Sequence, residues 1–435
     1  MIFEVLTTAS MLGVLGTSFY YKTNSKNNDV EKIMKIAENN KLSTKDEKLR
    51  LYRKSYNKKN DFTEYVFKMP LGLSFDQFKE KENNFIDGLN NRSVIRIDLK
   101  DLKKLKFDKT LIKQLKKIFL NSRVPLDKQI EIEYDGMLIF RVYNKGLTDF
   151  VPYDDEMLKK VGGWEVLIGV TYKEFIKHDF EKMQMFVVAG MTRYGKTVFL
   201  KNAITTLINN QSENVRLYLV DLKGGLAFSR FIKCKQVKAV AKDEQETLIT
   251  LEMLHEEMKT RQQYFLSKGY EDIGEAGIDE RTFIVIDEGA EIAGFEDKVV
   301  RDRCTFLVSE IARIGAGLGY RLIFATQYPV SDVFPRQVKA NTSAALCFKL
   351  KNATQSSVVL DEGGAEKLPV GLRGRAIYQT DRKVIVQTPF IDNKFIDIKI
   401  KPHITFTPRS DNKNASQQNK KEEQGGTYTT KFEKA

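Results

Sequence analysis

Short apolar runs alternate with longer amphipathic segments over residues 161–407 of this 435-residue chain. The short runs are rich in β-branched and aromatic residues and predict buried strands, whereas the longer segments repeat apolar residues at helical spacing. The predicted strands are 185–189, 216–220, 282–286 and 321–325, and the predicted helices are 198–209, 243–267 and 299–314. This order predicts an α/β domain with a largely parallel sheet.

A less regular mixture of patterns precedes that domain. Residues 61–160 predict a small α+β domain that serves as a spacing or interaction module. Its predicted elements are a strand at TEYVFKMP, a helix over 74–89 capped by Ser74, a strand over 94–98, a helix over 111–120, and a hairpin that turns at Asp135-Gly136. The Lys-, Asn- and Glu-rich residues 22–60 indicate a solvated basic linker, helical only over about 29–39. Residues 408–435 contain few apolar residues and predict a disordered tail.

The first apolar stretch, residues 2–21, reads IFEVLTTASMLGVLGTSFYY and contains a single charge, Glu4. About twenty residues of helix span the hydrocarbon core of a bilayer. Lysines follow this stretch, at Lys22, Lys26, Lys32 and Lys35. The positive-inside rule then places the rest of the chain in the cytoplasm. We therefore expect residues 1–21 to form one transmembrane helix in the cell membrane, with a buried core helix as the alternative.

One predicted strand-to-helix junction carries a phosphate-binding pattern. In MFVVAGMTRYGKTVFL, the strand ends at Gly190, and Gly195-Lys196-Thr197 begins the helix. Glycines permit backbone conformations closed to other residues, and the N–H groups at a helix N-terminus favour a polyphosphate. Lys196 is the candidate that reaches the β- and γ-phosphates of ATP, and the Thr197 hydroxyl is a candidate Mg²⁺ ligand. The predicted nucleotide-binding residues are Gly190, Met191, Thr192, Arg193, Tyr194, Gly195, Lys196, Thr197 and Val198. A chance match in a glycine-containing turn is the alternative.

Two carboxylates end the predicted strand 282–286. Asp287 and Glu288 would be costly there unless a cation or water used them, so the pair indicates a Walker B site, with a solvated strand end as the alternative. Asp287 would hold Mg²⁺ through water, and Glu288 would act as the general base on the attacking water. Gln327, after the strand 321–325, is a candidate contact to the γ-phosphate or its water. An ordinary strand-ending turn before Pro329 is the alternative.

The composition of the chain indicates a class of binding partner and a cellular compartment. The net charge of +13 and the pI of about 9.2 favour nucleic acid or anionic lipid as partners, although a generally Lys-rich composition gives the same values. The cysteines Cys234, Cys304 and Cys347 show no paired spacing, which indicates free thiols in a reducing compartment. The histidines are isolated as well, which argues against a His/Cys metal site.

Five stretches together resemble the motor domain of FtsK/SpoIIIE-type DNA translocases. They are DFEKMQMFVVAGMTRYGKT, LVDLKGG, FIVIDEGAE, EIARIGAGLGYRLIFATQYP and VVLDEGGAEKLPVGLRGRAIY, in this order over about residues 160–390. The sequence ATQ-x-P followed by LD-x-GGAEKL is more specific than the phosphate loop alone. With one apolar N-terminal segment, a small N-terminal unit and a single motor, the chain most resembles the coupling ATPases of Gram-positive conjugative elements, the ConQ and TcpA type.

The resemblance implies a P-loop NTPase fold of the RecA-like, FtsK/HerA type that hydrolyses ATP with Mg²⁺. It also implies a homohexamer that moves single- or double-stranded DNA through its pore, and a neighbouring subunit that supplies an arginine to the γ-phosphate. Arg313 and Arg373 are the candidates for this arginine, with a surface salt bridge as the alternative for Arg313. Lys223 is a candidate pore residue, with a structural turn as the alternative. The implied partners are a relaxase or relaxosome, conjugation channel proteins and the membrane.

Two residues depart from the family pattern, because Arg193 and Tyr194 stand where family loops hold small side chains. The mouth of the phosphate loop should therefore be bulkier and more cationic. Three other functions stay open from the sequence. They are a chromosome-type FtsK/SpoIIIE translocase, a protein-secretion ATPase, which usually carries several motors in tandem, and a non-hydrolysing docking platform for a DNA-processing complex.

Overall fold

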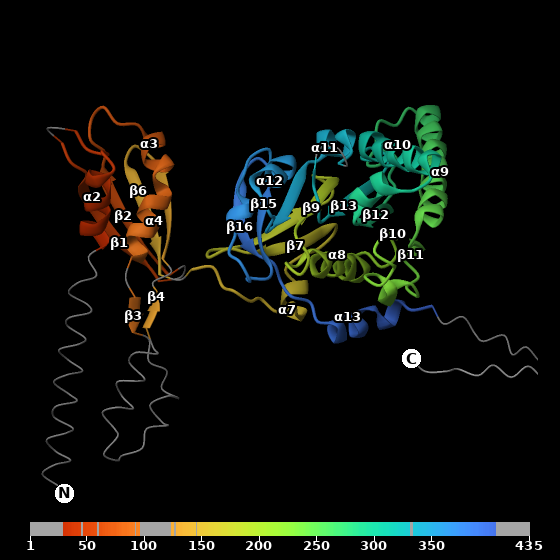
Figure 1. Cartoon of the computed structure of the whole chain (residues 1–435), viewed down its shortest axis with the longest axis horizontal. Helices are drawn as coiled ribbons and strands as arrows, with labels where there is room; N and C mark the ends of the chain where they lie inside the picture. The colour runs from red at the N-terminus through yellow and green to blue at the C-terminus, as the bar shows by residue number, and fades with distance from the viewer. Residues whose placement is uncertain are drawn as a thin grey trace, which may run out of the picture.

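The computed structural model describes residues 29–44, 47–58, 61–91, 93–95, 123–125, 128–144, 146–330 and 334–405. The predictions of a membrane helix over 1–21, a helix over 111–120 and a disordered tail over 408–435 lie outside these residues. Among the helices that are described, none combines the length and the apolar character needed to cross a bilayer. The described chain forms two units, the first drawn in red to yellow and the second in yellow to blue (Figure 1).

The first unit contains an antiparallel sheet of strand order β1-β2-β6-β5. Its elements are α2 (Asp29–Asn39), β1 (Arg50–Asn57), β2 (Phe62–Lys68), α3 (Phe75–Glu80), α4 (Glu82–Asn90), β5 (Gln129–Tyr134) and β6 (Leu138–Tyr143). A separate ladder pairs β3 (Ser93–Ile95) with β4 (Arg123–Pro125). The helices bury apolar side chains against one face of the larger sheet, and Phe85 of α4 meets Phe140 of β6 edge to face at 5.0 Å. The predicted hairpin is confirmed, with Gly136 at φ +66° in its turn.

The predicted helix over 74–89 is interrupted. Lys81 separates α3 from α4, although the start is as expected because Gln77 Oε1 accepts a hydrogen bond from the Ser74 N–H. The predicted strand 94–98 is described only as far as Ile95, within β3. The α+β character predicted for this part of the chain is therefore present, whereas the single long helix is wrong.

The prediction of a solvated linker over residues 22–60 is wrong for the described part of that range. Ile33 and Ala37 of α2 are buried in the core of the first unit, and Asp29 forms a buried ion pair with Lys128 at 2.6 Å. β1 is exposed along its whole length but pairs with β2 as an edge strand. The helix predicted over about 29–39 is nevertheless confirmed as α2. The burial of its apolar side chains and the strand β1 were not predicted.

The second unit is built on a ten-stranded mixed sheet of order β11-β10-β12-β13-β9-β14-β15-β16-β7-β8. Its strands are β7 (Glu165–Val170), β8 (Phe175–Asp179), β9 (Met185–Ala189), β10 (Val215–Asp221), β11 (Val237–Ala241), β12 (Arg281–Asp287), β13 (Tyr320–Thr326), β14 (Ala344–Phe348), β15 (Arg375–Gln379) and β16 (Lys383–Gln387). The strands from β11 to β14 are parallel, whereas β15, β16, β7 and β8 pair antiparallel. The parallel sheet that the sequence predicts is therefore the six-stranded part of a mixed sheet.

Helices cover both faces of this sheet. They are α7 (Asp155–Leu158), α8 (Lys196–Asn210), α9 (Glu244–Lys268), α10 (Lys298–Ile314), α11 (Arg336–Asn341), α12 (Ala353–Leu360) and α13 (Asn393–Ile400). Short 3-10 turns complete the unit at Ser229–Phe231, Gly289–Gly294, Ala365–Lys367 and Lys401–His403. α9 and α10 pack side by side over one face (Figure 1), and α8 and α13 contribute to a second core on the other. The predicted helices agree with α8, α9 and α10 to within two residues at each end.

The parallel strands bring the candidate site together. In the ladders, Ala189 at the end of β9 lies beside Thr326 at the end of β13, and Asp221 of β10 lies beside Asp287 of β12. Because parallel strands end at a common edge, the phosphate loop, the two carboxylates and Gln327 emerge on the same side of the sheet. We call this the carboxyl edge and the opposite side the amino edge.

Candidate functional site

The phosphate loop is a tight connection between β9 and α8. Gly190 and Gly195 are both required by their surroundings. A Cβ at Gly190 would lie 2.6 Å from the Phe348 Cβ, and Gly195 has φ +126°. Arg193 also occupies the left-handed region, at φ +70°, a conformation that is uncommon outside glycine. The loop therefore has a fixed, compact shape that ends at the N-terminus of a fifteen-residue helix.

Lys196 links the loop to the Walker B strand. Its side chain is 3% exposed, and Nζ lies 2.7 Å from Asp287 Oδ1 and 2.5 Å from Glu288 Oε1. The Thr197 hydroxyl donates to Asp287 Oδ2 at 3.3 Å. The structure thus brings together four of the residues that the sequence selected, although the partner of Lys196 here is a pair of carboxylates.

Glu288 is held in position from two directions. Its backbone has φ +64°, and a Cβ at the next residue, Gly289, would lie 2.4 Å from the Phe324 ring, so the turn needs a glycine there. Glu288 Oε2 accepts a hydrogen bond from the Gln327 backbone N–H at 3.0 Å, and the Gln327 side-chain amide donates to Oε1. Gln327 Oε1 in turn accepts from the Thr192 hydroxyl at 2.5 Å. Gln327 therefore connects the phosphate loop to the candidate base.

The oxygen atoms at this edge fit a small divalent cation. Asp287 is buried, and its Oδ1 accepts no well-aligned hydrogen bond from the described residues, although Lys196 Nζ is close. The Thr197 hydroxyl and the Asp287 carboxylate lie side by side and offer the hard ligands that Mg²⁺ prefers. Within the described ranges, no group of three or more His, Cys, Asp or Glu side chains could hold a metal alone. Mg²⁺ commonly takes one or two carboxylates plus substrate phosphates, which agrees with this arrangement.

Two neighbouring cavities open at the carboxyl edge, with volumes of 720 Å³ and 660 Å³. Both are lined by Met191, Thr192, Lys223 and Gln327. The larger one also contains the phosphate loop, Lys196, Thr197 and Arg373, and the smaller one contains Glu288. Ligand cavities typically measure roughly 300–1,000 Å³, so the larger cavity has room for a nucleotide.

The structure separates the two candidate arginines. Arg373 lines the larger cavity of its own chain. Arg313 lines neither cavity and forms an ion pair with Glu310 at 2.8 Å, with 53% of its side chain exposed. It lies in the last turn of α10, which leads into the amino end of β13 and so belongs to the amino edge. Within one chain, Arg313 is therefore not part of the site.

Asp221 is a site residue that the sequence analysis passed over. It ends β10 beside Asp287, is 1% exposed, and accepts hydrogen bonds from the backbone N–H groups of Lys223 at 3.1 Å and Ala227 at 2.7 Å. These bonds shape the loop that places Lys223 at both cavities. The signal was available, because a carboxylate ends this apolar strand as one ends β12.

Lys201 lies one turn beyond Thr197 on α8. Burial lowers the pKa of Lys201, and nearby Arg230 lowers it further, although the charges of Asp221 and Asp287 act in the opposite direction. The field at this edge therefore combines several buried charges on adjacent elements.

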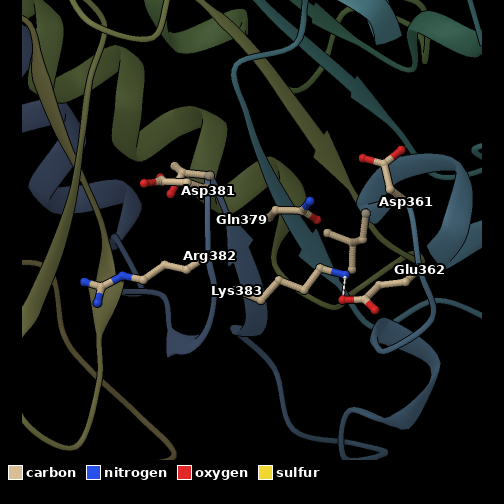
Figure 2. A pocket seen from close by; sticks show the side chains of 8 residues that line it. Asp361, Glu362, Gln379, Asp381, Arg382 and Lys383 are labelled. Atoms are coloured by element: carbon tan, nitrogen blue, oxygen red, sulfur yellow. Dashed lines mark hydrogen bonds and ion pairs between the residues drawn. The ribbon is translucent and has the colours of Figure 1, made fainter. Parts of the chain in front are cut away.

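A separate hollow of 420 Å³ lies between the end of α12 and the β15–β16 turn (Figure 2). It is lined by Leu360, Asp361, Glu362, Gln379, Thr380, Asp381, Arg382 and Lys383. Lys383 Nζ pairs with Glu362 Oε1 at 2.5 Å, and the remaining charged groups are spread around the rim (Figure 2). Nothing in this hollow has the convergent arrangement seen at the carboxyl edge.

Comparison with known proteins supports the resemblance. Residues 163–283 match the FtsK/SpoIIIE family. The DNA translocase FtsK of Chlorobaculum tepidum is 27% identical over 243 residues, which cover 52% of this chain and 30% of the relative. The DNA translocase SpoIIIE of Bacillus subtilis is 29% identical over 251 residues, which cover 53% and 31%. The chain thus matches about a third of the length of these curated relatives.

Solved structures show the same fold. The pCW3 conjugation coupling protein TcpA has a TM-score of 0.55 at 22% identity, and the match covers 87% of this chain and 99% of that chain. The cytoplasmic domain of the Thermomonospora curvata type VII secretion ATPase EccC has a TM-score of 0.50 at 22% identity, covering 57% and 32%. The predicted resemblance to FtsK/SpoIIIE-type translocases is confirmed, and the second unit has an α/β P-loop NTPase-like fold with a mixed sheet.

Proposed function

We propose that this chain, with its FtsK/SpoIIIE-type motor, is a membrane-anchored, ATP-driven DNA translocase that delivers DNA to a conjugation channel. The observation that carries the proposal is the cluster of Lys196, Thr197, Asp287 and Glu288 beside a 720 Å³ cavity. Curated relatives of the matched segment are DNA translocases, which supports DNA as the substrate. The domain boundaries at 21, 60, 160 and 407 stay predictions, except that the linker ends earlier than residue 60 because α2 and β1 are folded.

Nucleotide binding would exchange the partners of Lys196. The phosphates enter beside the N–H groups at the start of α8, where the helix dipole favours negative charge. Lys196 then turns from Asp287 and Glu288 to the β- and γ-phosphates. Thr197 and Asp287 would hold Mg²⁺, which when bound neutralises negative charge on the phosphates.

This exchange would also release the base. With Lys196 on the phosphates, Glu288 Oε1 loses the ammonium group that lies 2.5 Å away. The freed carboxylate accepts a proton from the attacking water as that water forms a bond to the γ-phosphorus. The bond from the γ-phosphorus to the β,γ-bridging oxygen breaks, and ADP leaves. Gln327, placed between Thr192 and Glu288, orients the water, so hydrolysis requires a phosphate in the loop.

Assembly and DNA contact form the next part of the proposal. A homohexamer would place an arginine of one copy at the γ-phosphate of its neighbour, where it stabilises developing charge. Arg313, with its exposed guanidinium, is the candidate for this contact in trans, whereas Arg373 would act within its own chain. Lys223 lines both cavities and is the candidate that couples nucleotide binding to DNA contact. Contacts to DNA phosphates would bind DNA independently of its sequence.

The conjugation role rests on the extent of the likeness to TcpA. That match includes 87% of this chain, against 57% for the secretion ATPase, so more than the motor has a counterpart there. The partners in this role would be a relaxase or relaxosome, the channel proteins and the cell membrane, with the motor in the cytoplasm.

Phosphate release by the full chain, in detergent or nanodiscs, tests the function. We expect release to rise with added single- or double-stranded DNA. Glu288→Gln should lower it by at least about 100-fold while nucleotide still binds, because a general base contributes roughly 10²–10⁴-fold. The exposed Glu296→Gln is the matched control and should behave like the wild type. Hydrolysis that ignores DNA would favour protein secretion, and nucleotide binding without turnover would favour a docking platform.

A further inference from the structure

The 720 Å³ cavity continues past the phosphate loop to an aromatic wall that hydrolysis does not explain. Phe150, Pro389 and Phe390 line this end of the cavity. The rings of Phe150 and Phe390 are 6.0 Å apart at an angle of 39°, and these residues are 61% and 47% exposed. Large aromatic side chains with this exposure, inside a cavity that also holds Lys196, indicate a surface for a flat apolar group.

Phe150 comes from the segment that joins the two units. We call residues 146–154 the connector, because they follow β6 of the first unit and precede α7 of the second. Its backbone is bound to Phe390, since the Phe390 N–H donates to Val151 O at 2.8 Å and the Tyr153 N–H donates to Phe390 O at 2.9 Å. The Tyr153 hydroxyl also lies 2.7 Å from Thr206 Oγ1 on α8.

A second set of bonds fixes the connector ahead of Phe150. One guanidinium nitrogen of Arg375, in β15, shares its two N–H groups among Leu147 O at 3.2 Å, Thr148 O at 3.0 Å and Asp149 Oδ1 at 3.1 Å. Phe150 therefore lies between two attachment points, Arg375 on one side and Phe390 on the other. Its ring is presented to the cavity by a backbone that the motor itself orders.

We propose that Phe150 and Phe390 stack the base of the bound nucleotide, so that the connector forms one wall of the nucleotide site. This inference rests on the proposed nucleotide binding and identifies what holds the other end of the ligand. With the phosphates at Lys196, the nucleoside extends along the same cavity to the aromatic pair. Stacking on an aromatic ring suits any nucleobase, because every base has a π-face.

The nearby amide favours stacking over edge recognition. Gln387 lines this end of the cavity, but its Nε2 donates to Arg373 O at 2.8 Å and its Oε1 accepts from Arg375 Nε at 3.0 Å. Gln387 is thus engaged with the motor and the residue that binds the connector. Affinity for the base accordingly comes from the two rings.

The consequence concerns communication between the units. The connector begins just after the first unit, whose Tyr143 also packs against Tyr172 of the β7–β8 turn at 4.5 Å. A base stacked on Phe150 adds a third attachment to the connector, alongside Arg375 and Phe390. Nucleotide binding would therefore hold the connector, the segment that leads to the first unit, more firmly in place.

Binding of two polyphosphates to the full chain tests the proposal. ATP carries a base, and inorganic tripolyphosphate does not, so both are titrated in the presence of Mg²⁺. We expect Phe150→Ala to weaken ATP binding about 10-fold, as loss of one stacking ring does, and to leave tripolyphosphate binding within about twofold. Phe150→Trp should retain ATP binding. Phe175→Ala, which removes another exposed ring of the motor, is the control and should change neither ligand.

The outcomes separate this inference from the proposed function. If the wild type binds ATP and Phe150→Ala binds it equally well, or if the variant loses both ligands equally, stacking on Phe150 is wrong while nucleotide binding stands. If the wild type binds no ATP, the proposed function itself fails. Hydrogen exchange gives a second readout, because ATP should slow exchange over residues 147–153 and tripolyphosphate should not. Equal protection by the two ligands would contradict the role of the connector.

Discussion

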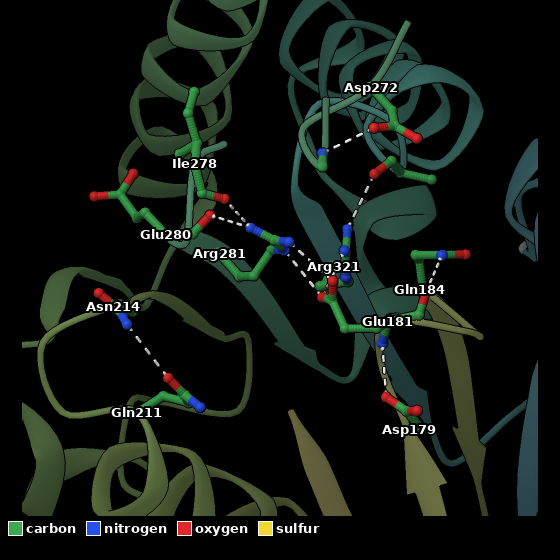
Figure 3. Close-up of polar contacts among 12 residues, drawn as sticks. Asp179, Glu181, Gln184, Gln211, Asn214, Asp272, Ile278, Glu280, Arg281 and Arg321 are labelled. Carbon is green, nitrogen blue, oxygen red and sulfur yellow. Dashed lines mark hydrogen bonds and ion pairs between the residues drawn. The ribbon is translucent and has the colours of Figure 1, made fainter. Parts of the chain in front are cut away.

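Two ion clusters lie at opposite edges of the same sheet, and they differ in charge balance. At the carboxyl edge, one ammonium, Lys196, is shared by two carboxylates, Asp287 and Glu288. At the amino edge, one carboxylate, Glu181, is shared by two guanidiniums, with Arg281 at 2.9 Å and Arg321 at 2.8 Å (Figure 3). The first cluster has excess negative charge and the second has excess positive charge.

The amino-edge cluster directs most of its guanidinium N–H groups to acceptors within the protein, although Arg321 Nε has no hydrogen-bond partner among the described residues. Arg281 donates to the carbonyl oxygens of Ile278 and Glu280 (Figure 3). Arg321 donates to the carbonyl oxygens of Ala316 and Tyr320. Burial raises the pKa of Glu181, but the hydrogen bonds from both arginines outweigh that effect and lower it overall. These three charged residues line neither cavity of the carboxyl edge. They join the starts of β12 and β13 to the loop before β9.

The carboxyl-edge cluster keeps its excess charge beside open space. Asp287 Oδ1 has no well-aligned hydrogen bond from the described residues, and Glu288 lines a cavity. A buried charge is therefore no sign of function by itself, because ion pairs also build structure. Here the distinguishing feature is the cavity beside the excess negative charge, which has room for a ligand that would bring the missing positive charge.

Among the substitutions in the two clusters, Lys196→Ala should have the largest effect, because it removes the ammonium of the carboxyl-edge cluster. Without the ammonium, phosphates in the loop lose their principal side-chain donor, and hydrolysis should fall by roughly 1,000-fold, or about 4 kcal/mol in barrier height. Steady-state phosphate release by the full chain with saturating DNA measures the effect. Lys182→Ala, an exposed lysine near the amino edge, is the control. A rate for Lys196→Ala close to that of the wild type would remove Lys196 from catalysis.

Glu181→Gln should act on stability instead. Breaking a buried ion pair costs roughly 3–5 kcal/mol, and because the Glu181 side chain is 37% exposed we expect about 2 kcal/mol. Urea unfolding of the full chain should show this loss, while turnover of the folded protein stays within about twofold of the wild type. The exposed Glu174→Gln should change neither quantity. Lost turnover with unchanged unfolding would show that the amino edge also serves catalysis.

His178 makes a smaller contribution to the free energy of unfolding, and this contribution depends on pH. It is fully buried in β8, where its ring stacks on Phe186 at 4.4 Å, and burial lowers its pKa to about 3. As pH falls, His178 is therefore protonated in the unfolded chain at a higher pH than in the folded chain. The contribution of neutral His178 is complete above its ordinary pKa of about 6.5 and decreases as pH falls through the window towards 3.

At about pH 5.5 the loss from this histidine should be about 1.4 kcal/mol. Urea unfolding near pH 7.5 and pH 5.5 measures it, and His178→Gln provides the reference because a glutamine side chain does not titrate in this range. We expect the wild type to lose this amount more than the variant. Identical pH dependence in the two proteins would mean that His178 is protonated in the folded state.

The sequence predicted the second unit well because each element has its own apolar pattern. The strand 185–189 agrees with β9 at both ends, since a fully buried parallel strand is an uninterrupted apolar run. Lys196, Thr197, Asp287, Glu288 and Gln327 could be grouped without coordinates, because parallel strands deliver their ends to one edge.

The remaining features depend on contacts that are distant in sequence. Phe150 joins the cavity only because the connector binds Phe390 through its backbone, and no local pattern signals that contact. The Glu181 cluster needs the starts of two strands and a loop in one place. The helix predicted over 29–39 is confirmed as α2, but its burial in the core and the strand β1 were missed, because lysine-rich composition outweighed the few apolar positions at Ile33 and Ala37.

Calorimetric titration of the full-length Glu288→Gln protein with MgATP tests the central claim most directly, because hydrolysis is blocked and Lys196 remains. We expect one site per chain, and adding Lys196→Ala to this background should weaken binding by at least about tenfold. Absence of binding, or equal affinity with and without Lys196, would show that this ion cluster is a structural feature like its counterpart at the amino edge.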